Sequence, residues 1–160
     1  MTALPPRSST ASASMVRSVR PTRLDRARGN SRVIVAMGPL PVASTSELSA
    51  RLVALARVSV GNRLGIVRAG DGRDWYHDPH HLVDAVRDWS SEFPGTEHLS
   101  VPDKLAHLRA ATVTPVGLRI YLSGAHLITD IPHAVFDGVM VVRLWLYLSL
   151  IHISEPTRLG

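Results

Sequence analysis

The residues best suited to chemistry lie near the end of the chain, in the stretch HAVFDG. It supplies His133, Asp137 and Gly138 in the pattern His-x-x-x-Asp-Gly, which composition alone predicts about 0.03 times in a chain of this length. A neutral imidazole titrates near pH 7 and can take a proton from an attacking hydroxyl or amine. We predict that His133 ends a strand and that Asp137 and Gly138 begin a helix, so that a cleft can reach the imidazole. The alternative is a histidine whose hydrogen bonds are satisfied at a helix start, with Asp137 as the N-cap.

A second group of polar side chains occurs earlier, in WYHDPHHLVDAV. It contains His77, Asp78, His80, His81 and Asp84 within eight residues. On a helix, His80 and Asp84 would lie four residues apart and could share one face, and zinc is the metal that such a pair suits. However, no third ligand is clearly positioned, and Asp78 followed by proline is already explained as a helix start. We therefore expect no metal site, and a small metal-binding domain remains the less favoured alternative.

The elements that must position these residues alternate between strand and helix. Short β-branched runs predict strands at 32–38 and 63–69, and a hairpin of 117–122 with 125–131 joined at Ser123-Gly124. A first helix is predicted after a capping box of Ser44 and Glu47, with Leu48, Leu52 and Leu55 on one face. A second helix is predicted to begin at Asp78-Pro79 and to bury Leu82, Val83, Val86 and Trp89. A third, short helix is predicted over 102–111. This order indicates an α/β or mixed α+β fold with one shared core.

Composition narrows the possible function classes. The chain has 160 residues, 45% of them hydrophobic, which suffices for one domain, and it lacks the cysteines of a disulfide framework or thiolate site. The formal charge of +5 originates in the first thirty residues, where six arginines face the single acid Asp25. Because the remaining chain is nearly neutral, we do not expect nucleic-acid binding. The apolar run near the end is interrupted by Arg143 and is too short for a transmembrane segment.

The stretch from about Arg20 to Tyr147 resembles the N-terminal half of the condensation-domain superfamily of CoA- or carrier-dependent acyltransferases. This superfamily includes nonribosomal peptide condensation domains, wax ester synthases and chloramphenicol acetyltransferase, and its hallmark is HHxxxDG. His133 matches the second, catalytic histidine, and Asp137 and Gly138 match the Asp-Gly pair. Pro132 stands where many members have the first histidine. The opening RPTRLDR and the strand ending in MGPL are also similar to the entry into the first lobe of that fold.

The resemblance implies an acyltransferase in which His133 is the general base. Acyl-CoA or an acyl carrier protein thioester would be the donor and co-substrate, an alcohol or amine the acceptor, and no cofactor would be permanently bound. Asp137 would pair with an arginine and shape the loop, and Arg20, Arg23 and Arg26 are its candidate partners. Gly138 permits a tight turn, and its N–H could face an oxyanion. The expected location is cytoplasmic. A non-catalytic condensation-like domain that serves as a binding or scaffold module is the alternative from another class.

The same resemblance gives a domain organisation. Residues 1–19 are expected to be a disordered or mis-called N-terminal extension. Residues 20–147 would form the truncated N-terminal lobe of a chloramphenicol acetyltransferase-like two-lobe fold, a mixed sheet with flanking helices. Residues 148–160 begin with LSLIHISEPTR, which matches the in-frame translation of a common transposase-type sequencing adapter, and we expect this segment to be non-native. The 160-residue chain by itself is then expected to be inactive.

Overall fold

The computed structural model describes residues 16–29, 31–40, 44–58, 63–69, 73–111, 115–136 and 138–150. Its central element is a four-stranded sheet in the order β2 (Arg32–Met37), β7 (His126–Pro132), β6 (Arg119–Ser123) and β5 (Val86–Asp88). The strand β7 is antiparallel to both of its neighbours, whereas β5 runs parallel to β6. The sheet is therefore mixed, as the fold class expected from the sequence requires.

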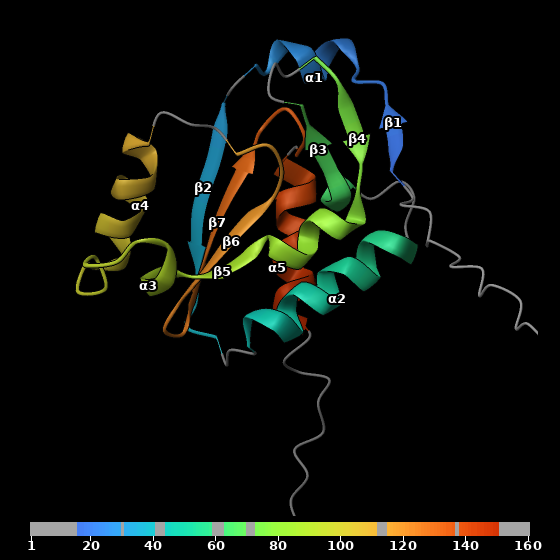
Figure 1. Ribbon diagram of the computed structural model, residues 1–160. Helices are drawn as coiled ribbons and strands as arrows, with labels where there is room; N and C mark the ends of the chain where they lie inside the picture. The colour runs from blue at the N-terminus through green and yellow to red at the C-terminus, as the bar shows by residue number, and fades with distance from the viewer. Residues whose placement is uncertain are drawn as a thin grey trace, which may run out of the picture.

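A smaller sheet lies beside the first one. Its strands are β1 (Arg17–Val19), β4 (Trp75–His77) and β3 (Ile66–Arg68), and β4 is the central strand with an antiparallel partner on each side. The short helix α1 (Arg23–Ala27) connects β1 to β2 and lies above both sheets in Figure 1. Two 3-10 helices, η1 (Arg63–Gly65) and η2 (Pro79–Asp84), precede β3 and follow β4.

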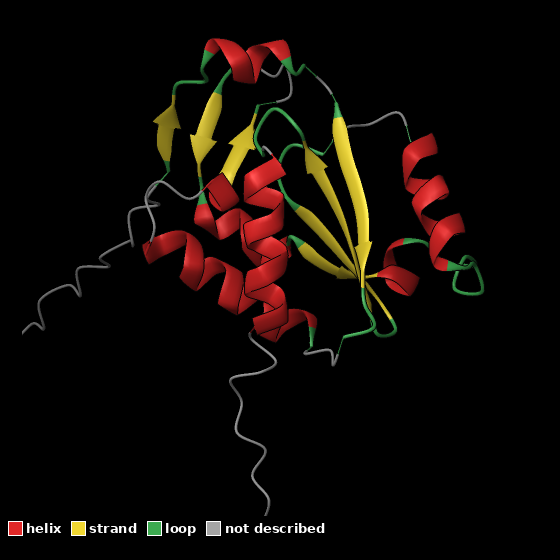
Figure 2. Cartoon of the chain, turned by 180° about the vertical axis from the view of Figure 1, so that it is seen from behind, coloured by secondary structure: helices red, strands yellow, loops and turns green. Residues whose placement is uncertain are grey.

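Helices cover both faces of the four-stranded sheet. Figures 1 and 2 show α2 (Thr45–Val58) and α5 (Gly138–Leu150) on one side, and α3 (Trp89–Glu92) with α4 (Val101–Ala110) on the other. The buried side chains follow the same division. Leu127 and Ile131 of β7 belong to the larger core cluster with α2 and α5, whereas Ile128 belongs to a second cluster with Trp89 and Leu108. This alternation is the period of two that a strand between two helical layers requires.

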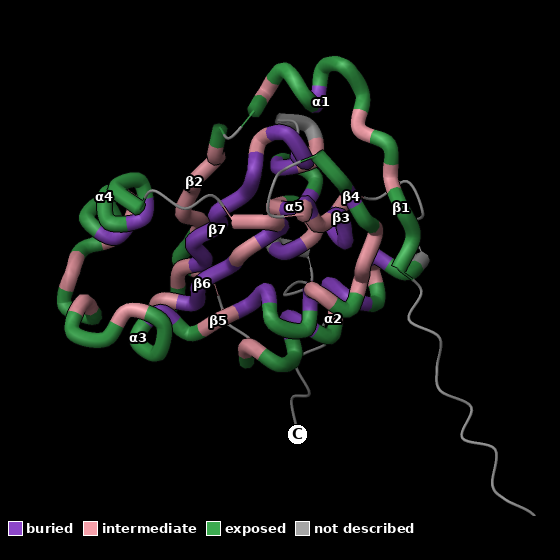
Figure 3. Tube along the Cα trace, turned by 45° about the horizontal axis from the view of Figure 1, so that its top comes forward, coloured by how far each residue is buried: buried purple, intermediate pink, exposed green. Residues whose placement is uncertain are grey.

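The sheet is the most deeply buried part of the molecule. In Figure 3 buried residues run along β6 and β7, while the outer helical surfaces and α1 are mainly exposed. The strand that leads to the His-x-x-x-Asp-Gly motif is thus a central strand with a partner on either side and a helical layer over each face. It fixes the position at which the motif begins.

Several local predictions are confirmed. The strand at 32–38 is β2, the helix at 102–111 is α4, and the hairpin is β6 and β7, antiparallel and linked through Gly124. Ser44 Oγ accepts the backbone N–H of Glu47 at 3.2 Å at the start of α2, which is one half of the predicted capping box, and Leu48 and Leu52 are buried. The Glu47 carboxylate accepts a hydrogen bond from Arg51 at 2.6 Å. These features depend on residues close in sequence, which is why they can be predicted locally.

Two predictions need correction. The segment 63–69 begins with the 3-10 turn η1, and only its last part is strand and loop. The helix expected from Asp78 to Trp89 is instead η2, β5 and the first residue of α3. Val83, expected in the core, is 46% exposed. The reason is that Val86 to Asp88 pair in parallel with β6, a long-range contact that overrides the apparent helical period.

The last helix, α5, is the most apolar one. It extends past Tyr147 to Leu150, and Leu148 is 1% exposed within the larger core cluster. No helix in the described part of the chain has both the length and the apolar character needed to cross a bilayer.

Candidate functional site around His133

His133 immediately follows the last residue of β7, as the sequence predicts. Pro132 is paired with Arg32 at the start of β2 and contributes no N–H to the ladder, which suits a strand end. The backbone N–H of His133 donates to the Ser31 carbonyl at 2.8 Å. The main chain of His133 is therefore held to the segment that precedes β2.

The chain turns directly after His133. The Pro132 carbonyl accepts hydrogen bonds from the N–H groups of Val135 at 3.0 Å and Phe136 at 3.2 Å. Ala134, Val135 and Phe136 are all at most 2% exposed, so three consecutive side chains anchor the turn in the core. Such a turn is rigid, and it keeps the half-buried His133 side chain in a defined position.

The imidazole of His133 has one nitrogen engaged. Its Nδ1 lies 3.0 Å from the Phe136 carbonyl oxygen. A carbonyl oxygen can only accept a hydrogen bond, so Nδ1 carries the hydrogen in this contact. In the neutral ring the lone pair then lies on Nε2, which is the nitrogen that can take a proton. The backbone thus selects the tautomer needed for a general base at Nε2.

The other two motif residues differ in what the structure describes. Gly138 is the first residue of α5, as predicted. Asp137 lies outside the described residues, and so does any pairing with an arginine. The three arginines considered as its partners, Arg20, Arg23 and Arg26, are exposed.

A buried ion pair that the sequence analysis did not identify lies on the same strand. The Asp130 carboxylate, 3% exposed, receives a bidentate hydrogen bond from Arg32, with Nε to Oδ1 at 3.0 Å and Nη2 to Oδ2. Arg32 Nη1 also donates to the Ala111 carbonyl at the C-terminal end of α4, at 2.8 Å. This pair joins β2, β7 and α4, and its aspartate, Asp130, lies three residues before His133 in the chain. A lone aspartate within the apolar strand was the available signal.

A second buried carboxylate fixes the N-terminal segment. Asp25 closes a capping box with Thr22 at the start of α1, and Arg63 donates to both of its oxygens, at 3.0 and 2.8 Å. Burial alone would raise the pKa of Asp25, but the hydrogen bonds from Arg63 and Thr22 lower it to about 2. The guanidinium of Arg63 also lies over the Trp75 ring at 5.7 Å. Asp25 was noted from sequence only as the single acid of its region.

The histidine-rich segment folds differently from the α-helix on which a pair of metal ligands was considered. The residues 79–84 form a 3-10 helix, in which positions four apart point in different directions, so His80 and Asp84 do not share a face. His80 is exposed and Asp78 serves as the N-cap of η2, with its carboxylate accepting the His80 N–H at 3.2 Å. Within the described ranges, no group of three or more side chains is arranged to hold a metal ion.

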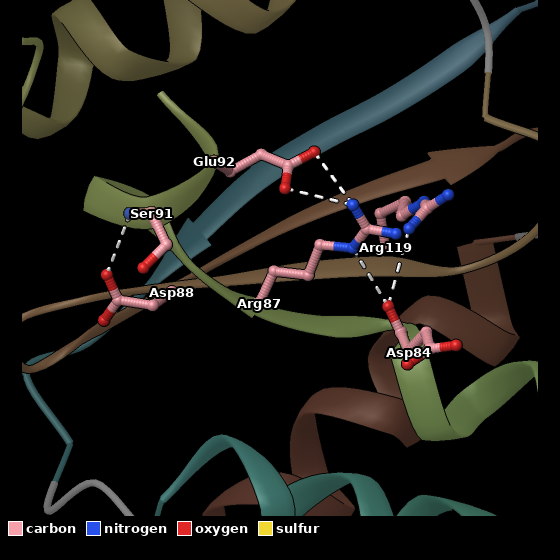
Figure 4. Close-up of polar contacts among 6 residues, drawn as sticks. All are labelled: Asp84, Arg87, Asp88, Ser91, Glu92 and Arg119. Atoms are coloured by element: carbon pink, nitrogen blue, oxygen red, sulfur yellow. Dashed lines mark hydrogen bonds and ion pairs between the residues drawn. The ribbon is translucent and has the colours of Figure 1, made fainter. Parts of the chain in front are cut away.

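The carbonyl of Asp84 has a structural role at the end of that segment. It accepts Arg87 Nε at 3.1 Å and Arg119 Nη1 at 3.5 Å, and Arg87 Nη1 contacts both carboxylate oxygens of Glu92 at 3.0 Å (Figure 4). In the same view Asp88 caps α3 by accepting the Ser91 N–H at 3.3 Å. These contacts hold η2, β5, β6 and α3 together.

Comparison of the chain with models of known protein families, with curated proteins and with solved structures finds no match. The functional assignment therefore depends on the residues themselves and on the geometry around His133.

Proposed function

We propose that the protein is an acyltransferase that moves an acyl group from a CoA or carrier-protein thioester to an alcohol or amine, with His133 as the general base. The observation that carries this proposal is the hydrogen bond between His133 Nδ1 and the Phe136 carbonyl, which leaves the lone pair of the neutral ring on Nε2. The His-x-x-x-Asp-Gly pattern and the strand-to-helix setting of the motif support it.

The reaction follows from this proton acceptor. As the acceptor oxygen or nitrogen attacks the thioester carbonyl, its proton moves to Nε2 and a new bond to carbon forms. When the tetrahedral intermediate collapses, the carbon–sulfur bond breaks and the imidazolium returns the proton to the leaving thiolate. General-base catalysis of this kind contributes about 10²–10⁴-fold to the rate.

We propose further that residues 20–147 form the N-terminal lobe of a two-lobe enzyme similar to chloramphenicol acetyltransferase. A mixed sheet with helices on both faces, and a histidine at the end of a central strand, support this assignment. The non-catalytic binding or scaffold module is the second candidate, and Pro132 in place of the first motif histidine favours it.

The decisive experiment compares two substitutions of His133. The asparagine side chain of His133→Asn can still donate to the Phe136 carbonyl but has no proton acceptor equivalent to Nε2, whereas His133→Ala loses both functions. We expect both variants to fold and both to lose about 10²-fold or more in turnover, measured as thiol release from acetyl-CoA and longer acyl-CoA donors with a panel of alcohols and amines.

The protein for this assay is the product of the gene read beyond codon 147, and His126→Asn is the matched control. His126 is a half-buried histidine at the opposite end of β7, so its replacement should leave turnover unchanged. Parental activity in a folded His133→Asn variant would eliminate the general-base role. A parent protein that binds acyl-CoA without releasing thiol would favour the scaffold candidate.

A further inference from the structure

The last residue of β3, Arg68, has a guanidinium buried in the interior. Arg68 is 7% exposed, and burial lowers its pKa. None of the ion pairs in the described ranges involves Arg68, and its Nε has no hydrogen-bond partner. Removing a cation from water without a carboxylate partner is unfavourable. A hydrophobic side chain at this position would avoid that penalty, which indicates that the charged group has a specific role.

The only side-chain hydrogen bond of Arg68 in the described part of the molecule goes to the turn that follows α1. Its Nη1 donates to the Gly29 carbonyl at 3.0 Å, while its backbone N–H donates to the Val116 carbonyl at 2.8 Å. Gly29 follows α1 and has a φ of +55°, a left-handed conformation that glycine adopts without strain. Two backbone hydrogen bonds also hold this turn, from the Gly29 N–H to the Arg26 carbonyl at 3.2 Å and from the Ser31 N–H to the Arg28 carbonyl at 3.3 Å, and the guanidinium adds a charged donor to them.

That turn also supports His133. Gly29 directly follows Arg28, whose carbonyl accepts the Ser31 N–H at 3.3 Å, and the Ser31 carbonyl receives the His133 backbone N–H at 2.8 Å. The Gly29 carbonyl is bound from β3 and the Ser31 carbonyl from the end of β7. Arg68 and His133 therefore bind two carbonyls that follow α1, one through its side chain and the other through its main chain.

We propose that Arg68 is a positioning residue for His133, acting through the carbonyls of Gly29 and Ser31, which are linked by the hydrogen bond from the Ser31 N–H to Arg28, the residue before Gly29. The guanidinium fixes the Gly29 carbonyl, and this fixes the Ser31 carbonyl against which the His133 main chain is aligned. The geometric part of this inference stands on the hydrogen bonds alone, and its catalytic consequence rests on the proposed function.

The direct test is amide hydrogen exchange in the 160-residue chain. In Arg68→Met we expect the His133 N–H to exchange about tenfold faster than in the parent, the size expected for losing a hydrogen bond from a charged donor. The Ile120 N–H, which donates to Ala85 elsewhere in the sheet, should keep its parental rate. Arg68→Lys retains a charged donor and should give an intermediate His133 rate.

Arg87→Met is the matched control, because the side-chain hydrogen bonds of Arg87 in the described structure go to Glu92 and to the Asp84 carbonyl. It should leave the His133 amide unchanged. Equal protection of the His133 amide in the parent and in every Arg68 variant that folds would overturn the proposal, and so would faster exchange at His133 and Ile120 alike.

Activity separates this inference from the proposed function. In the longer gene product, Arg68→Met should lower kcat for acyl-CoA with little change in KM, and Arg68→Lys should restore part of it. If His133→Asn abolishes turnover while Arg68→Met changes neither kcat nor the His133 amide, the role of Arg68 is refuted and the proposed function stands. If His133→Asn stays active while Arg68→Met speeds exchange of the His133 amide, the proposed function is refuted and the positioning role of Arg68 stands.

Discussion

At the scale of single residues, the placement of hydrogen atoms decides what each histidine can do. The Nδ1 of His133 lies on a carbonyl, so the lone pair of its neutral ring lies on Nε2. The Nε2 atoms of His77 and His81 are buried and have no hydrogen-bond partner. At His81, burial disfavours the charged ring and lowers its pKa. The same side-chain type is thus a candidate base at one position and an apolar-like packing group at another.

His81 should make folding stability depend on pH. Burial lowers its pKa, assisted by Arg119 and Arg87 and opposed by Asp78 and Asp84. The unfolded chain therefore binds the proton first, near pH 6.5, so the stability is full above that value and falls as the pH drops below it. The loss can reach at most about 1.4 kcal/mol per pH unit for one proton.

Urea unfolding of the parent and of His81→Leu between pH 7.5 and about 5 measures this effect. The variant should show a smaller decrease in unfolding free energy, and His80→Leu, at the exposed neighbouring position, should behave as the parent does. Identical pH profiles for the parent and the His81 variant would show that His81 is protonated equally in both states.

At the scale of elements, α3 and α4 are fastened to the sheet by one buried ammonium. Lys104, the single lysine of the chain, is 6% exposed. Its Nζ donates to the Ser123 hydroxyl at 2.7 Å and to the Glu97 carbonyl at 3.2 Å, and it lies 5.5 Å from the centre of the Trp89 ring. It therefore joins α4 to the end of β6 and to the turn after α3.

Replacing this lysine tests how much that fastening contributes. Lys104→Met keeps most of the side-chain volume but removes both hydrogen bonds, and the gain from no longer burying a charge offsets part of the loss. We expect the unfolding free energy to fall by about 1–2 kcal/mol in urea titrations. Arg109→Met, on the exposed side of α4, should change it by less than about 0.5 kcal/mol. A Lys104 variant as stable as the parent would contradict this account.

Elements set by local chemistry were predictable, and elements set by distant partners were not. The Ser44 cap, the leucines of α2 and the hairpin of β6 and β7 follow from residues near one another. By contrast, the secondary structure of residues 78–89 depends on the parallel pairing of β5 with β6. The Arg32–Asp130 pair joins residues 98 positions apart, and the lone aspartate in its apolar strand did not indicate which arginine would be its partner. His133 was identified from its motif, whereas its tautomer needed the position of the Phe136 carbonyl.

At the scale of the whole molecule, the outer side of α5 is the exposed apolar surface with the clearest consequence. Val142 and Leu146 lie four residues apart and are 50% and 56% exposed, and the helix contains no acidic residue among its thirteen. The opposite side of the same helix is anchored by Val141, Leu144 and Leu148 in the core. A helix that is apolar around most of its circumference is usually covered. In the proposed two-lobe enzyme, other parts of the protein could pack against this side of α5.

We therefore expect the 160-residue chain to self-associate through this side of α5 as its concentration rises. Val142→Glu with Leu146→Lys places an opposite-charge pair at a favourable helical spacing and removes the apolar stripe without touching the core. Sedimentation velocity over a concentration series should show association in the parent and a monomer in the double variant, with thermal midpoints within a few degrees of each other. Val83→Glu with Tyr76→Lys, at exposed apolar positions on η2 and β4, should leave the association unchanged. Association that persists in the α5 variant but disappears in this control would assign the contact to the small sheet and η2 instead.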